Sequence, residues 1–110
     1  MASAIKERIR VEIAAHPVVL FMKGTPEIPM CGYSLRAVDA LRAAGATRLH
    51  TVNVMADPEI RANLPRFSDW PSFPQLFVQG ELIGGADIVV ELGEVGELAR
   101  IVAEAEGGAA

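Results

Sequence analysis

The chain has 110 residues, of which 51% are hydrophobic and 22% are charged, and its formal net charge is −4. This length suffices for one core, so we expect a single domain over residues 1–110 with a disordered end at 106–110. The acidic balance and the scattered distribution of the ten basic residues argue against nucleic-acid binding. No apolar run is long enough for a signal peptide or a membrane span, so we expect a cytoplasmic protein that does not bind membranes.

A helix and a strand are predicted in the first 22 residues. Ser3 is a candidate N-cap for the helix, and Pro17 follows its predicted end. Residues 18–22, Val-Val-Leu-Phe-Met, form an apolar run that indicates a strand covered on both faces. The buried face of the helix is expected to consist of isoleucines at four-residue spacing: Ile5, Ile9 and Ile13.

The loop after this strand contains the single cysteine, Cys31. A second helix is predicted from Gly32 onward, and Gly45 ends it. Its buried face is expected to consist of Leu35, Val38 and Leu41. The thiol is therefore expected between the end of a strand and the start of a helix.

A strand over residues 49–54 is followed by a short third helix. Asp57, Pro58 and Glu59 have the order of an N-cap, a first helical residue and a first-turn acid. This helix is expected to be short and to bury Ile60 and Leu64, and Pro65, Pro71 and Pro74 form a proline-punctuated stretch that leads to the next strand.

Strands over residues 75–79 and 82–83 form a predicted hairpin, because Gly80 and Glu81 give the turn between them. A final helix is predicted after Asp87, its candidate N-cap. The apolar positions of that helix include Val90, Val95, Leu98, Ile101 and Val102.

The expected order of elements is α-β-α-β-α-β-β-α. The strand–helix–strand units need a parallel pair with a right-handed crossover, whereas the hairpin needs an antiparallel pair. We therefore expect an α/β fold in which a four-stranded mixed sheet has helices on both faces, as in thioredoxin-like proteins.

Cys31 is the strongest candidate for chemistry. The free N–H groups and the dipole at a helix start favour thiolate, and Lys23 at the end of the preceding strand adds a positive charge. A buried, inert cysteine is the alternative, which the adjacent Gly32 and the loop position disfavour. Ser34 occupies the place of the second cysteine of a Cys-X-X-Cys motif, so a two-thiol mechanism within one chain is excluded.

Three further groups of residues are candidate binding elements. Residues 70–74, Trp-Pro-Ser-Phe-Pro, are either a packed turn or, with a cis peptide before Pro74, a turn that offers the Phe73 backbone to an extended ligand. Residues 84–87, Gly-Gly-Ala-Asp, are either a loop with an N-cap or an anion site whose Asp87 accepts from an ammonium group. The third group consists of Lys23, Arg61 and Arg66. These side chains either bind a ligand carboxylate or are ordinary solvated cations, and Arg61 is the better candidate of the two arginines for carboxylate binding.

Four segments carry a resemblance to a known family. They are 21–26 (Phe-Met-Lys-Gly-Thr-Pro), 31–34 (Cys-Gly-Tyr-Ser), 70–76 (Trp-Pro-Ser-Phe-Pro-Gln-Leu) and 84–87 (Gly-Gly-Ala-Asp). In this order and spacing the chain resembles the monothiol glutaredoxins of the Cys-Gly-Phe-Ser type, from about Ile5 to Ile101. Two residues depart from the family pattern: Tyr33 stands where Phe is usual, and Ala86 stands where many members have a second cysteine.

The resemblance implies a glutathione site and a [2Fe–2S] cluster. In the family the cluster bridges two protomers, each of which contributes one protein sulfur, here that of Cys31, and one glutathione sulfur. The implied glutathione residues are Lys23 and Arg61 for the glycyl carboxylate, Phe73 and Pro74 for the cysteinyl part, and Gly85, Ala86 and Asp87 for the γ-glutamyl end.

The implied function is storage and transfer of iron–sulfur clusters in iron homeostasis. The implied partners are a second copy of the chain, a BolA-family protein and apo iron–sulfur proteins. The alternative is an enzyme, a glutathione-dependent thiol–disulfide oxidoreductase in which Cys31 attacks glutathionylated substrates. A third hypothesis is a binding module in which the thiol has no part.

Overall fold

The computed structural model describes residues 1–107, which form four strands and five helices. The strands are β1 (Val18–Met22), β2 (Leu49–Asn53), β3 (Gln75–Val78) and β4 (Glu81–Gly84). The helices are α1 (Ser3–Ala14), α2 (Gly32–Ala43), α3 (Pro58–Ser68), α4 (Ala86–Glu94) and α5 (Glu97–Gly107). Within this described part of the chain, no helix is long and apolar enough to cross a membrane.

The strands form one mixed sheet in the order β2-β1-β3-β4. β1 pairs in parallel with β2, whereas β3 is antiparallel to both β1 and β4. All five residues of β1 are buried, as its continuous apolar sequence predicts. The predicted thioredoxin-like arrangement, a mixed four-stranded sheet, is confirmed.

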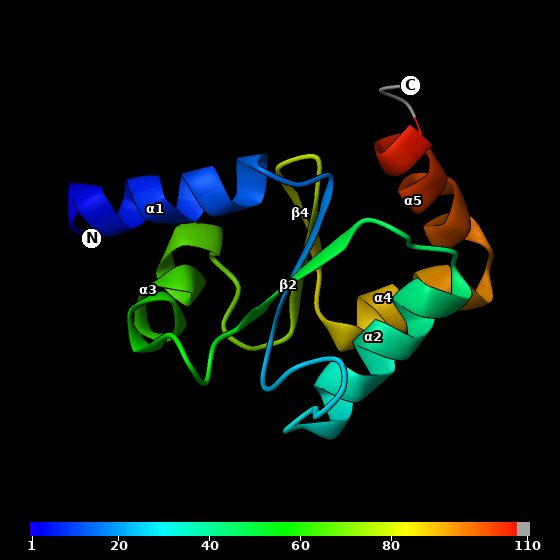
Figure 1. Ribbon diagram of the computed structural model, residues 1–110, viewed down its shortest axis with the longest axis horizontal. Helices are drawn as coiled ribbons and strands as arrows, with labels where there is room; N and C mark the ends of the chain where they lie inside the picture. Colours follow the sequence, from blue (N-terminus) through cyan, green and yellow to red (C-terminus); the bar gives the residue numbers. More distant parts are fainter. Residues whose placement is uncertain (108–110) are drawn as a thin grey trace.

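Helices cover both faces of the sheet, with α1 and α3 on one side and α2, α4 and α5 on the other (Figure 1). Because side chains alternate along a strand, β1 contributes to two separate cores. Val19 and Phe21 pack with residues of α1 and α3. Leu20 and Met22 pack with residues of α2, α4 and α5. One central strand therefore fixes the positions of both helical layers.

Two predicted N-caps are wrong, and one is confirmed. α1 already includes Ser3, because the extended residue Ala2 precedes the helix. Asp87 lies inside the first turn of α4, because the extended residue Gly85 occupies the N-cap position. The confirmed cap is Asp57, whose Oδ1 accepts a hydrogen bond of 3.2 Å from the N–H of Ile60 at the start of α3.

The buried face of α2 differs from the predicted one. Leu35 is 42% exposed, whereas Ser34 is fully buried. The face toward the sheet contains Ser34, Ala37, Val38 and Leu41, because the Ser34 hydroxyl bonds to the end of β1.

Two other helices have ends that the sequence did not predict. α3 continues through Pro65 to Ser68, so Pro65 belongs to the helix and not to the proline-punctuated stretch after it. The prediction of a single final helix is wrong, because the helix is interrupted between α4 and α5 at Gly96, whose φ is +78°. Val95 at this break is 72% exposed and belongs to no buried face.

α5 extends to Gly107, two residues into the segment for which a disordered end was expected. The Glu106 carboxylate accepts hydrogen bonds from the N–H groups of Thr47 and Arg48, so it ties this helix end to the segment before β2. The rest of that expectation, at residues 108–110, lies outside the described residues.

Candidate functional site

Cys31 lies between the end of β1 and the start of α2, as the sequence predicts. It is the N-cap residue of α2, with an extended backbone, and it is partly exposed. Hydrogen bonds order the loop before it. The N–H of Met30 donates to the carbonyl of Lys23 at 2.9 Å, and Thr25 and Ile28 exchange two backbone hydrogen bonds of 3.1 Å.

Gly24 allows this loop to fold back on itself. Its φ is +88°, and a Cβ atom at this position would lie 2.4 Å from the carbonyl oxygen of Ile28 and 2.6 Å from the nitrogen of Met30. The Gly24 N–H donates to the side-chain oxygen of Asn53 in β2 at 3.0 Å. The cysteine loop is therefore attached to the sheet at its start.

Ser34 connects the start of α2 to the end of β1. Its buried Oγ accepts a hydrogen bond of 3.1 Å from the N–H of Lys23. The same hydroxyl group also contributes to lowering the pKa of Cys31. The serine at the place of a second cysteine thus fixes the start of α2 against Lys23 and acts on the thiol.

Opposing effects act on the thiol of Cys31. Partial burial raises its pKa, because the thiolate loses hydration. The backbone N–H groups of Ser34 and Tyr33, the Ser34 hydroxyl and the positive charge of Lys23 outweigh the burial, so the pKa of Cys31 lies below its ordinary value. Thiolate is the form that attacks disulfides and binds soft metals. The local structure therefore favours a reactive thiol.

A hollow of about 440 Å³ opens beside Cys31. Lys23 and Arg61 line it and make it suitable for an anionic group near the thiol. Arg66, the other arginine candidate, lies on α3 but outside this lining. The lining residues are Lys23, Cys31, Tyr33, Arg61, Pro65, Pro71, Ser72 and Phe73.

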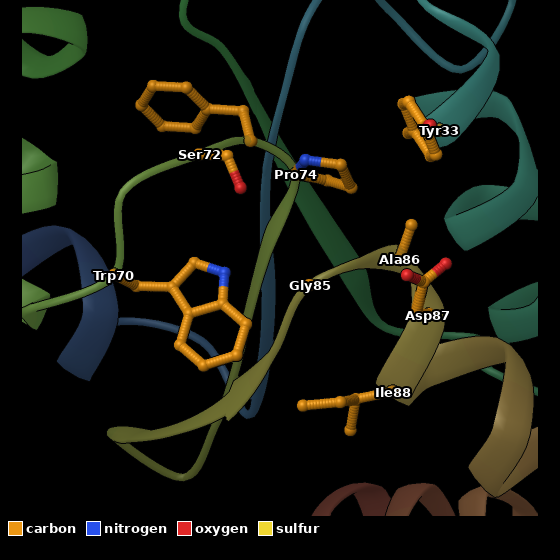
Figure 2. Close-up of a pocket in the computed structure, with 9 residues that line it drawn as sticks. Tyr33, Trp70, Ser72, Pro74, Gly85, Ala86, Asp87 and Ile88 are labelled. Atoms are coloured by element: carbon orange, nitrogen blue, oxygen red, sulfur yellow. The ribbon is translucent and has the colours of Figure 1, made fainter.

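A second hollow of about 260 Å³ contains the remaining predicted residues. In Figure 2, Trp70 and Pro74 lie on one side of it, and the start of α4 with Asp87 lies on the other. The peptide bond between Phe73 and Pro74 is cis. The two hollows share lining residues and together form one cleft. The shared residues are Tyr33, Ser72 and Phe73, and the second hollow adds Trp70, Pro74, Gly85, Ala86, Asp87 and Ile88.

Gln75 shapes the turn that forms one side of the cleft. This side chain is buried, and its amide donates to the carbonyl oxygens of Trp70 at 3.0 Å and Ser72 at 3.1 Å. Gly85 packs against the same turn, because a Cβ atom there would lie 3.2 Å from the indole nitrogen of Trp70. The turn and the start of α4 are therefore in direct contact.

The described residues contain no site that holds a metal ion by itself. Within residues 1–107, no three His, Cys, Asp or Glu side chains come close enough together to bind one. Cys31 is the only cysteine of the chain, so one protomer contributes one thiolate to any shared site.

Trp70 and Ser72 line the cleft, although the sequence predicts ligand contacts only for Phe73 and Pro74 within this turn. The prolines at 71 and 74 predict a turn at this place, but they do not show which side chains of the turn face the cleft. Tyr33 was singled out only as a departure from the family pattern, and it lines both hollows.

Comparison with known proteins gives the family. Residues 18–83 match the family described as Glutaredoxin. Glutaredoxin 4 of Escherichia coli K12 is 49% identical over 98 residues, which cover 89% of this chain and 84% of that protein. The probable monothiol glutaredoxin GrlA of Legionella pneumophila is 52% identical over 87 residues, which cover 79% of this chain and 97% of that protein.

A solved structure agrees with this result. The buckwheat glutaredoxin–glutathione complex matches with a TM-score of 0.80 at 25% identity, and the match covers 94% of this chain and 91% of that one. Because the fold, the cysteine loop and the sequence matches agree, the chain belongs to the glutaredoxin family, and its close relatives include monothiol members.

Proposed function

We propose that the cleft binds glutathione. A related buckwheat glutaredoxin has been solved in complex with glutathione. The cleft has two cations at one end, Lys23 and Arg61, and a carboxylate, Asp87, at the other. Glutathione has a glycyl carboxylate at one end and a γ-glutamyl ammonium group at the other, so its charges complement those of the cleft.

In this proposal each end of the ligand has its own partners. Lys23 and Arg61 hold the glycyl carboxylate, and Asp87 accepts from the γ-glutamyl ammonium group. The remaining contacts come from the backbone at Phe73 and Pro74 for the cysteinyl part, and at Gly85 and Ala86 for the γ-glutamyl end.

The proposed cargo of the protein is a [2Fe–2S] cluster. One observation carries this proposal: the single cysteine has a thiol with a lowered pKa at the edge of the cleft. A [2Fe–2S] cluster takes four thiolates, and one chain supplies one. One chain therefore cannot complete the site alone, and the ligand set that we propose is the one implied by the resemblance to monothiol glutaredoxins: Cys31 from each of two protomers and one sulfur from each of two glutathione molecules.

Such a cluster is suited to transfer, because half of its ligands are small molecules that dissociate when the cluster leaves. The proposed role is cluster storage and transfer in iron homeostasis. The proposed partners are a second copy of the chain, a BolA-family protein and apo iron–sulfur proteins that receive the cluster.

Anaerobic reconstitution with iron and sulfide, with and without glutathione, tests this function. We expect the visible absorption of a [2Fe–2S] cluster only when glutathione is present, and none in the Cys31→Ser variant. Circular dichroism of that variant checks that it is folded. A cluster that forms equally well without glutathione, or with Cys31→Ser, contradicts the proposal.

The lowered pKa of Cys31 also supports a second function, glutathione-dependent disulfide reduction. The Cys31 thiolate attacks the glutathione sulfur of a glutathionylated protein, and the protein thiolate leaves. A second glutathione thiolate then attacks the Cys31–glutathione disulfide, which releases oxidised glutathione and restores the Cys31 thiolate. A deglutathionylation assay separates the two functions: sustained turnover that Cys31→Ser abolishes, in a protein that forms no cluster, favours the enzyme.

A further inference from the structure

A charged pair lies beside the γ-glutamyl end of the proposed glutathione cleft. The guanidinium group of Arg36, on α2, lies 4.0 Å from Oδ1 of Asp87, on α4. The side chains are 55% and 89% exposed, respectively. A pair at this distance and exposure adds little to fold stability, so both charges remain available to a ligand.

Arg36 lines neither hollow of the cleft, but it is next to Tyr33. The guanidinium carbon of Arg36 lies 5.7 Å from the centre of the Tyr33 ring, within the range of a cation–π interaction. Tyr33 itself lines both hollows. Figure 2 shows its ring and the Asp87 carboxylate on the same side of the second hollow. Arg36 thus lies just outside the cleft, next to one residue of its wall and to its acidic group.

Two opposite charges at this spacing complement a free amino-acid head group. The γ-glutamyl end of glutathione carries an α-ammonium and an α-carboxylate on the same carbon atom. Asp87 alone recognises only the ammonium. A planar guanidinium next to it supplies the donors that a carboxylate accepts in a bidentate manner.

We propose that Arg36 is a specificity-determining residue that binds the α-carboxylate of the γ-glutamyl group while Asp87 binds the α-ammonium. This inference rests on the proposed glutathione site. The ligand replaces the loose Arg36–Asp87 contact with two contacts of its own. The chain thereby selects ligands that end in a complete amino-acid head group over peptides with only an amine there.

Isothermal titration calorimetry with two ligands tests this role. One is S-methylglutathione, which cannot exchange disulfides. The other is its analogue with a 4-aminobutanoyl group in place of γ-glutamyl, which lacks only the α-carboxylate. For Arg36→Gln we expect about two- to fivefold weaker binding of S-methylglutathione, the effect of a partly exposed charge pair, and unchanged binding of the analogue.

Arg42→Gln is the matched control, because Arg42 is an exposed arginine on the same helix that, unlike Arg36, has no ion pair with Asp87 and no cation–π contact with Tyr33. This variant has the same change in net charge and should bind both ligands like the parent chain. If Arg36→Gln weakens both ligands equally, the effect is general electrostatics and the assignment is wrong. Unchanged or tighter binding of S-methylglutathione by Arg36→Gln also overturns it. If the parent chain binds neither ligand, the glutathione site itself fails, and this inference fails with it.

Discussion

The Cys31 thiol owes its reactivity to a few neighbouring groups. Burial alone raises its pKa, and the local hydrogen bonds and Lys23 reverse that effect. Ser34 has two roles, because its hydroxyl lowers the pKa of the thiol and also accepts a hydrogen bond from the Lys23 N–H. The residue in the place of a second cysteine is therefore part of the chemistry at the first.

Replacing Ser34 with alanine removes this hydroxyl group, so the pKa of Cys31 should rise. Because a hydrogen bond contributes ~1 kcal/mol, we expect alkylation of Cys31 by iodoacetamide at neutral pH to slow by roughly fivefold. The pH profile of the alkylation rate gives the pKa directly. Ser68→Ala is the control, because Ser68 donates to Leu64 within α3, away from the cleft. An unchanged pH profile in Ser34→Ala contradicts this account of the thiol.

The loop before Cys31 depends on close backbone packing at Gly24. Gly24→Ala should destabilise the chain by about 1–2 kcal/mol for the left-handed backbone and by a further ~1–3 kcal/mol for the overlap with Ile28 and Met30. Gly45→Ala has nearly the same φ, +87°, but nothing within 4 Å of the new Cβ atom, so it should show only the first effect. Urea unfolding compares the two variants. Equal losses in both would show that the loop does not pack as described.

Helix α3 is held at its start by Asp57. The hydrogen bond from Arg8 lowers the pKa of Asp57 and outweighs the effect of burial, and the Ile60 N–H lowers the pKa further. The folded-state pKa is therefore below the unfolded one, so the carboxylate stabilises the fold above the unfolded pKa. This contribution disappears as the pH falls through the folded-state pKa, below about 4.

Asp57→Ala should therefore lower the free energy of unfolding at pH 7 by about 1–2 kcal/mol. The difference from the parent chain should shrink in urea titrations at pH 3 and below. Glu91→Gln, an exposed change on α4, serves as the control. A difference that stays the same from pH 7 to pH 2 would mean that the Asp57 charge does not stabilise α3.

Elements with strong local signals were predicted correctly, whereas those set by distant contacts were not. Apolar composition alone identified β1, and the Asp-Pro-Glu order identified the start of α3. The face of α2 depends on the hydrogen bond that the Lys23 N–H donates to the Ser34 hydroxyl, which sequence periodicity does not reveal. The break at Gly96 was missed because apolar residues occur on both sides of it.

At the scale of the whole molecule, the sheet brings the site together. The antiparallel pairing of β1 with β3 places the end of β1 next to the start of β3. The cysteine loop follows the end of β1, and the turn at residues 70–74 precedes the start of β3, so the two segments lie at the same edge of the sheet. The antiparallel β3–β4 hairpin brings the start of α4 to the same edge. The candidate residues were identified by motif, but their gathering in one cleft follows only from this topology. Which turn residues face the cleft depends on Gln75 and on three-dimensional packing.

In the proposed cluster site, Cys31 supplies one thiolate, and a second chain and glutathione supply the others. Native mass spectrometry of the anaerobically reconstituted protein measures this composition. We expect one species that contains two chains, two glutathione molecules and one [2Fe–2S] cluster, and we expect this species to be absent in Cys31→Ser. A cluster on a single chain, or a cluster-bridged dimer without glutathione, would contradict it.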